Sequence, residues 1–227
     1  MGREYIDLLC SLPHLADPFV HRRPPISGVQ LTKRLDMLDF EDRALVSDLA
    51  KSFYWGDIPF DTSDERLVQR ASRAIDAVQY EDLSEWLFWR MDLRTVIAAL
   101  RRRHRGEDAP VGQRWGFGRY TRYLERNWAQ PHFRLEGHFT WLPEARTLLE
   151  SGESYELERL LLSAAWHYYT SQVPLQPYSI SEVWLYLMRW DLVERWCSYD
   201  ARQAQQRFDQ LVTSGLEASL QELRKIA

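Results

Sequence analysis

The stretch LSEWLFWRMDLRTVIAALRRRHRG, residues 83–106, decides the fold because it has the pattern of one long helix. Its apolar side chains recur at three- and four-residue spacing, which places them on one helix face: Trp86, Trp89, Leu93, Val96, Ile97 and Leu100. Arginines crowd the last turn, where positive charge complements the negative end of the helix dipole, and Gly106 supplies a stop. The stretch predicts a core helix with one solvated side and a basic carboxyl-terminal end.

Composition places the chain among ordinary globular proteins. Its 227 residues are 45% hydrophobic and 27% charged, enough for a sizeable core in one large domain or two small ones. The formal net charge of -4 argues against nucleic-acid binding, because affinity for phosphate comes mainly from excess lysine and arginine. Cys10 and Cys197 lie far apart and outside any Cys-x-x-Cys spacing, so we expect neither a disulfide framework nor a zinc site.

The sequence favours a cytoplasmic location. No run approaches the roughly 18 apolar residues that a membrane span needs, so we expect no direct insertion into a membrane. The start of the chain, with Arg3, Glu4 and Asp7, lacks the basic then apolar order of a signal peptide. We therefore expect a cytoplasmic protein that reaches a membrane only through a complex.

The remaining elements are also predicted to be helical. Before residue 83, Ser27, Asp39 and Thr62 are suitable N-caps for three helices, and residues 13–25 have the prolines of an extended segment. From residue 117 onward, the apolar spacing predicts helices over the following segments: 117–128, Pro143 to Gly152, Leu157 to Tyr168, Val183 to Trp196 and Phe208 to Leu223. Nothing resembles an alternation of strands and helices, so we expect an all-α protein.

A glycine-rich loop at residues 107–118 divides the predicted helices into two amphipathic halves. We predict an N-terminal half at 1–106 and a C-terminal half at 119–227, packed as a helical bundle, with a single continuous domain as the alternative. Arg90-Met91-Asp92-Leu93 recurs as Arg189-Trp190-Asp191-Leu192, each time late in a Trp-rich helix. If this short match is a true repeat, the halves are duplicated units that present an Asp at equivalent places.

The motifs of common chemistry are missing from the sequence. Gly116-Phe117-Gly118 lacks the third glycine of a phosphate loop and has the pattern of a turn. His132 and His138 are spaced unlike any standard pair of metal ligands, and no Gly-x-Ser-x-Gly elbow is present. We expect no catalytic residue, no metal and no cofactor.

Charged residues inside the apolar helices have two interpretations. Asp92 and Asp191 are candidate acid and base carboxylates, but each has an arginine two residues away, and structural ion pairing is the favoured use. Arg90 and Arg94 flank Asp92 and are expected to form ion pairs with it. Arg189 is expected to form the same kind of pair with Asp191. These five residues are therefore predicted to be structural charged positions.

The basic helix end consists of Arg101, Arg102, Arg103 and Arg105. Such a cluster is able to grip phosphate, to form a solvated helix end, or to contact an acidic protein partner. The ten tryptophans of the chain point toward the last of these, because aromatic residues and arginine are enriched in protein interfaces. We predict that the four arginines bind a protein partner.

Several segments carry a resemblance to known families. Tyr5-Ile6-Asp7-Leu8-Leu9-Cys10-Ser11-Leu12-Pro13, Pro24-Pro25-Ile26-Ser27 and Leu157-Glu158-Arg159 resemble an uncharacterised bacterial family encoded beside V-type ATPase subunits. The helix from Asp92-Leu93-Arg94 to Leu100-Arg101 and the Val183 to Trp196 helix are similar to the Asp-containing helices repeated in the rotor-capping subunit of the A/V-type rotary ATPases, the one called d in eukaryotes.

The resemblance implies an all-helical, non-catalytic subunit that caps the membrane rotor ring and seats the central stalk. The chain is shorter than the full set of helical repeats in the rotor-capping subunit, which makes an accessory or assembly role as plausible as a stalk role. The expected partners are therefore protein subunits of a V-type ATPase. The alternatives are a general helical adaptor unrelated to the ATPase, and a small enzyme that uses Asp92 or Asp191.

Overall fold

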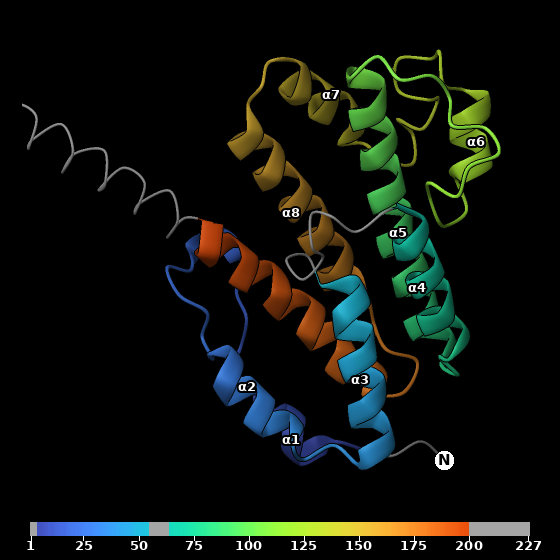
Figure 1. The fold of residues 1–227 in the computed structure, drawn as a ribbon. Coiled ribbons are helices and arrows are strands. Elements are labelled where there is room, and N and C mark those ends of the chain that lie inside the picture. Colours follow the sequence, from blue (N-terminus) through green and yellow to red (C-terminus); the bar gives the residue numbers. More distant parts are fainter. Residues whose placement is uncertain (1–3, 55–63, 200–227) are drawn as a thin grey trace, which may run out of the picture.

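The computed structural model describes residues 4–54 and 64–199, and within these residues every regular element is a helix (Figure 1). The elements are α1 (Ile6–Ser11), η1 (Pro18–Val20), α2 (Gly28–Leu35), α3 (Phe40–Phe53), α4 (Asp64–Asp76), α5 (Glu81–His104), α6 (Thr121–Arg126), α7 (Leu142–Glu150) and α8 (Ser154–Ser171), followed by a helix over residues 180–199. The prediction of an all-α protein is confirmed.

Local chemistry accounts for where several helices begin and end. The Ser27 hydroxyl accepts a hydrogen bond from the backbone N–H of Gln30, whose side chain accepts from the Ser27 N–H in return, which completes a capping box for α2. Asp39 caps α3 through the N–H of Asp42. Gly106 follows α5 with a φ of 78°, a left-handed conformation that favours glycine at a helix end.

The central helix α5 is buried on nearly every side between Trp86 and Leu100, so the expectation of one solvated side was wrong. It contacts α4, α6 and α7. It also meets α8, where the rings of Trp89 and Tyr168 stack with centroids 3.6 Å apart. A helix surrounded by others must bury polar positions as well as its apolar stripe, and Arg90 and Asp92 are two of these.

The helix over residues 180–199 packs against the N-terminal part of the chain. The Trp190 indole N–H donates to the carbonyl of Ile26 at 2.8 Å, and the rings of Phe19 and Trp196 meet edge to face at 4.7 Å. The Tyr186 hydroxyl donates to the carbonyl of Pro13. The extended segment predicted at residues 13–25 therefore lies along a helix of the opposite predicted half.

The described residues share one hydrophobic core, to which both sides of the loop 107–118 contribute. The predicted helix at 117–128 is shorter in the structure, at Thr121–Arg126, because the residues before it are held on α5 by hydrogen bonds. The predicted cap at Thr62 and the predicted helix from Phe208 to Leu223 lie outside the described residues. None of the helices in the described part is long and apolar enough to cross a membrane.

Candidate functional site

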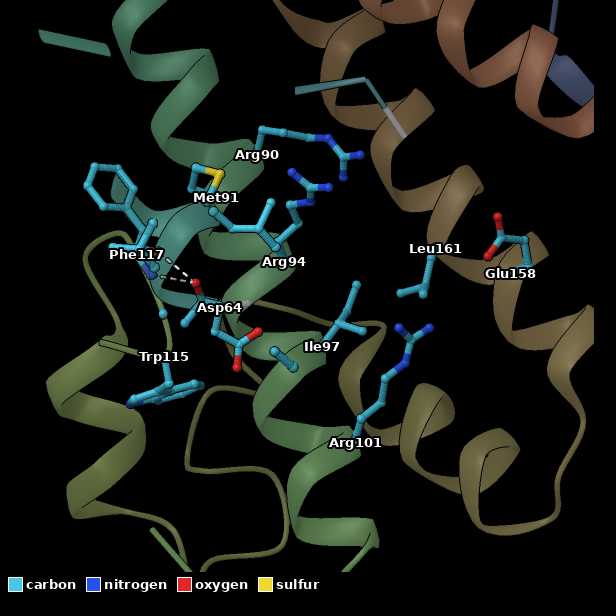
Figure 2. Close-up of a pocket in the computed structure, with 15 residues that line it drawn as sticks. Asp64, Arg90, Met91, Arg94, Ile97, Arg101, Trp115, Phe117, Glu158 and Leu161 are labelled. Carbon is cyan, nitrogen blue, oxygen red and sulfur yellow. Dashed lines mark hydrogen bonds between the residues drawn. The ribbon is translucent and has the colours of Figure 1, made fainter. Parts of the chain in front are cut away.

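A cavity of about 270 Å³ opens between α4, α5, α8 and the loop before α6 (Figure 2). Its apolar wall includes Met91, Ile97, Ala98, Trp115, Phe117 and Leu161. Its charged lining consists of Arg90, Arg94, Arg101, Asp64 and Glu158. The three arginines share one face of α5, since their spacing of four and then seven residues brings a side chain back to the same side of a helix.

The end of α3 positions two of these arginines. Arg90 Nε donates to the carbonyl oxygen of Phe53 at 3.3 Å, and Arg94 Nη1 donates to that of Ser52 at 3.0 Å. Ser52 and Phe53 are the last residues of α3, where carbonyl groups have no partner within their own helix. The guanidinium groups therefore satisfy the α3 end and complement its negative dipole.

Burial governs the charge of this arginine pair. Burial, with a smaller repulsion from Arg90, lowers the pKa of Arg94 to about 9, against attraction from Asp191. Burial also lowers the pKa of Arg90, against attraction from Tyr169, Asp191 and Glu158. Asp191, on the helix over residues 180–199, thus acts electrostatically on the arginines of α5.

Arg189 has a different place from its predicted counterpart Arg90. Its side chain is half-buried, and its Nε donates to the carbonyl of Leu185 one turn earlier in its own helix. Arg90, by contrast, is 3% exposed and reaches the end of α3. The two arginines of the proposed repeat therefore do different structural work, while the repeat itself stays a prediction.

Asp92 is completely buried and is bound by Arg119, from the loop before α6. Its Oδ1 accepts from the Arg119 backbone N–H at 2.7 Å, and its Oδ2 accepts from Arg119 Nε at 2.8 Å. Arg119 also pairs with Glu85 at 2.7 Å. Burial raises the pKa of Asp92, and the bonds from Arg119 oppose that rise.

The expectation that Arg90 and Arg94 would satisfy Asp92 was wrong. Residues two apart on a helix point to nearly opposite faces, so neither arginine reaches this carboxylate. Arg119 was not among the residues that sequence patterns singled out. The available signal was its place directly after Gly118, in a loop that follows a helix with a buried acid.

The glycines of the loop before α6 allow it to lie directly on α5. The Thr95 hydroxyl donates to the carbonyl of Phe117 at 2.7 Å and accepts from its N–H at 3.0 Å. A Cβ on Gly118 would lie 2.1 Å from Asp92 Oδ1, and a Cβ on Gly116 would lie 2.6 Å from Thr95 Cγ2. This turn therefore packs directly on α5 and forms one side of the cavity.

Two arginines of the basic helix end are bound within the fold, and the other two are exposed. Arg102 pairs with Asp64 at 2.6 Å. Arg103 donates to the carbonyls of Trp128, Gln130 and Pro131 and lies over the Phe133 ring. Arg105 is exposed and pairs with Glu107, while Arg101 is exposed and lines the cavity. Partner binding by these arginines stays a prediction. Arg101 and Arg105 are the two whose side chains are exposed enough to contact a partner.

The candidate groups for chemistry lie apart from one another. Within residues 4–54 and 64–199, no three His, Cys, Asp or Glu side chains are grouped to hold a metal ion. His138 meets the ring of Tyr120 at a centroid distance of 5.8 Å. Asp92 is committed to Arg119, and Asp191 lies beside cationic arginines, which is the environment of a structural carboxylate.

Comparison with known proteins adds the family. Residues 63–217 match the family described as "Protein of unknown function (DUF2764)". The chain belongs to this family. No curated protein and no solved structure matches the chain. The match confirms membership of an uncharacterised family. It shows no link to a rotary ATPase.

The matched region contains the whole described lining of the cavity, from Asp64 to Leu161, together with Asp92 and Arg119. It excludes α1, α2 and α3, and with them the carbonyls of Ser52 and Phe53 that hold Arg90 and Arg94. The family region therefore supplies the arginines, and the preceding part of the chain supplies two of the groups that orient them.

Proposed function

We propose that this protein is a non-catalytic, protein-binding accessory or assembly subunit of a V-type rotary ATPase. The resemblance of its sequence to families linked with that ATPase supports the choice of complex. The commitment of Asp92 to an internal ion pair supports a role without catalysis. A cytoplasmic position, peripheral to the membrane through the complex, is part of the proposal.

One surface carries the protein-binding part of this proposal. Exposed apolar side chains stand on three segments that hydrogen bonds hold together, and we call the group the Phe40 surface: Ile6, Met37, Phe40 and Tyr178. Tyr5 N–H donates to the carbonyl of Tyr178 at 2.7 Å, and the Tyr5 hydroxyl donates to Asp39 at 2.9 Å. Phe40 is 87% exposed although it begins a well-capped helix.

Such a surface favours a binding partner. Single exposed apolar residues are common, but exposed aromatic side chains on neighbouring ordered segments are typical of protein interfaces. The bonds of Tyr5 fix the segments in place before binding, so little conformational entropy is lost on association. We therefore place the contact with the partner here, at the end of the molecule where α3 begins (Figure 1).

The test is capture of partners from an extract of the source cells with the wild-type chain and two variants. Phe40→Asp disrupts the Phe40 surface, and Val111→Asp makes the same change at a residue that is 71% exposed in the loop 107–118. We expect wild type and Val111→Asp to recover V-type ATPase subunits and Phe40→Asp to lose them. Recovery of none by the wild type would overturn the choice of complex.

The general helical adaptor remains the second candidate, and the same capture distinguishes it. Recovery of a different set of proteins that depends on Phe40 would support the adaptor. Charge reversal at Arg101 and Arg105, in a separate variant, tests the predicted basic contact. Because exposed charges act mainly on association rate, we expect slower capture that is most evident at low salt.

A further inference from the structure

The charge of the cavity between α4, α5 and α8 is not balanced by the acids that line it. Asp64 is paired with Arg102 at 2.6 Å, and Glu158 is paired with Arg195 at 2.8 Å. Neither Arg102 nor Arg195 lines the cavity. Both lining carboxylates are thus neutralised by arginines outside it, while Arg90, Arg94 and Arg101 stand within it.

Two of the three lining arginines have donors to offer. Arg94 uses Nη1 for the carbonyl of Ser52, which leaves the rest of a guanidinium that carries five N–H donors. Arg101 makes no ion pair with any of the described residues, and its side chain is exposed. Figure 2 shows Arg90 and Arg94 extending from α5 toward α8, and Arg101 farther along the same helix. All three arginines line the same cavity, at two levels of one helix.

The rest of the wall is apolar and aromatic. Trp115, Phe117, Ile97 and Leu161 place apolar surface beside the charged groups. Arginine binds phosphate and carboxylate strongly, because its planar fork matches two of their oxygens at once. Small-molecule sites commonly combine apolar walls with a small number of polar groups, and this cavity has both.

We propose that this cavity binds a small organic phosphate, with the phosphate held by Arg94 and Arg101 and an apolar or aromatic group packed on the wall near Leu161. Asp191 attracts Arg90 and Arg94 from the helix over residues 180–199, which partly opposes the lowering of their pKa values by burial. A bound phosphate adds a second counter-charge on the open side. This inference does not depend on the proposed function, since it concerns the purified chain alone.

The first measurement is isothermal titration calorimetry of the full chain with three probes at low salt: inorganic phosphate, phenyl phosphate and phenol. We expect phenyl phosphate to bind most tightly, because it alone offers both the anion and the ring. Phosphate should bind more weakly and phenol should not bind measurably. Absence of binding by phenyl phosphate at millimolar concentration would overturn the proposal.

Variants locate the site. Arg101→Gln removes a cavity arginine that holds no described part of the fold, and Arg105→Gln makes the same charge change on the same helix end outside the cavity. Loss of one charge-assisted hydrogen bond should weaken phenyl phosphate binding roughly tenfold in Arg101→Gln and leave Arg105→Gln unchanged. Equal weakening in both variants would mean general attraction by the basic helix end, which contradicts the proposal.

A steric variant tests the cavity without changing charge. Ala98→Leu extends a half-buried lining side chain into the space and should abolish phenyl phosphate binding. Thermal denaturation of the free variant checks that it is folded. A folded Ala98→Leu protein that binds as well as wild type would place the anion elsewhere. Loss of protein capture by Arg101→Gln, with no phosphate binding by wild type, would instead assign these arginines to an acidic protein partner.

Discussion

Replacing Arg119 by methionine isolates the ion pair that holds the loop before α6 on α5. Methionine keeps much of the side-chain length and removes the charge. Asp92, which has no exposed side-chain surface, then loses its bond from Arg119 Nε and keeps the bond from the backbone N–H. The Asp92 carboxylate then stays buried with one of the two hydrogen bonds that it accepts from Arg119.

The structure sets the size of the effect. Breaking a fully buried pair by removing one partner costs on the order of 3–5 kcal/mol. Here Arg119 is 48% exposed, and water can reach the site after the replacement, so part of that cost is recovered. The remaining backbone bond lowers it again. We expect Arg119→Met to reduce the free energy of unfolding by about 2–3 kcal/mol near neutral pH.

The loss should also depend on pH in a defined direction. Burial raises the pKa of Asp92 in the folded protein, and Arg119 is the main group that opposes this rise. Without Arg119 the folded pKa rises further above the unfolded value, so the native state holds its proton to higher pH. Stability then falls as pH rises from the unfolded pKa to the new folded pKa. The variant should therefore lose less at about pH 5 than at about pH 8.

Urea unfolding at these two pH values measures both effects. Glu85→Gln is the control, because it removes the outer partner of Arg119, whose side chain is 54% exposed, and should cost less than about 1 kcal/mol. Asp92→Asn in the Arg119→Met background should abolish the added pH dependence. A cost for Arg119→Met that equals the cost of Glu85→Gln, or one that is the same at both pH values, would refute the reasoning.

Three further predictions concern packing and the basic helix end. Leu93→Ala should lower the free energy of unfolding by about 2–5 kcal/mol, because Leu93 has no exposed surface; an unchanged chemical denaturation curve would remove α5 from the core. Gly118→Ala should cost at least about 2 kcal/mol from clash and positive φ, whereas Gly112→Ala, with positive φ but open space, should cost about 1 kcal/mol in the same assay. Arg103→Gln should cost about 1–3 kcal/mol in thermal unfolding, because it bonds backbone carbonyls, and Arg105→Gln should cost less than about 0.5 kcal/mol; equal costs would contradict the division of the cluster.

The sequence places the arginines of the candidate site on one helix, but it does not predict which residue pairs with Asp92. The periodicity that predicts α5 also places Arg90, Arg94 and Arg101 on one face, since both follow from the geometry of a helix. The structural use of Asp92 stays a prediction, and the structure shows this carboxylate buried against Arg119. Closeness in sequence nevertheless indicated the wrong partners for Asp92, because side chains two residues apart on a helix point to nearly opposite faces. The cavity itself needs α4, α5 and α8 together, and no local pattern encodes their meeting.

The helical class, and the beginnings of α2 and α3 at Ser27 and Asp39, could be predicted from the chain alone. The interactions that decide them join residues three or four apart, so the sequence carries them directly. The partner of Asp92, the burial of α5 on all sides and the path of residues 13–25 along the helix over residues 180–199 were decided only by the tertiary structure. These contacts join residues far apart in the chain, and their formation depends on how every helix packs at once, because a close-packed core allows few arrangements of its side chains.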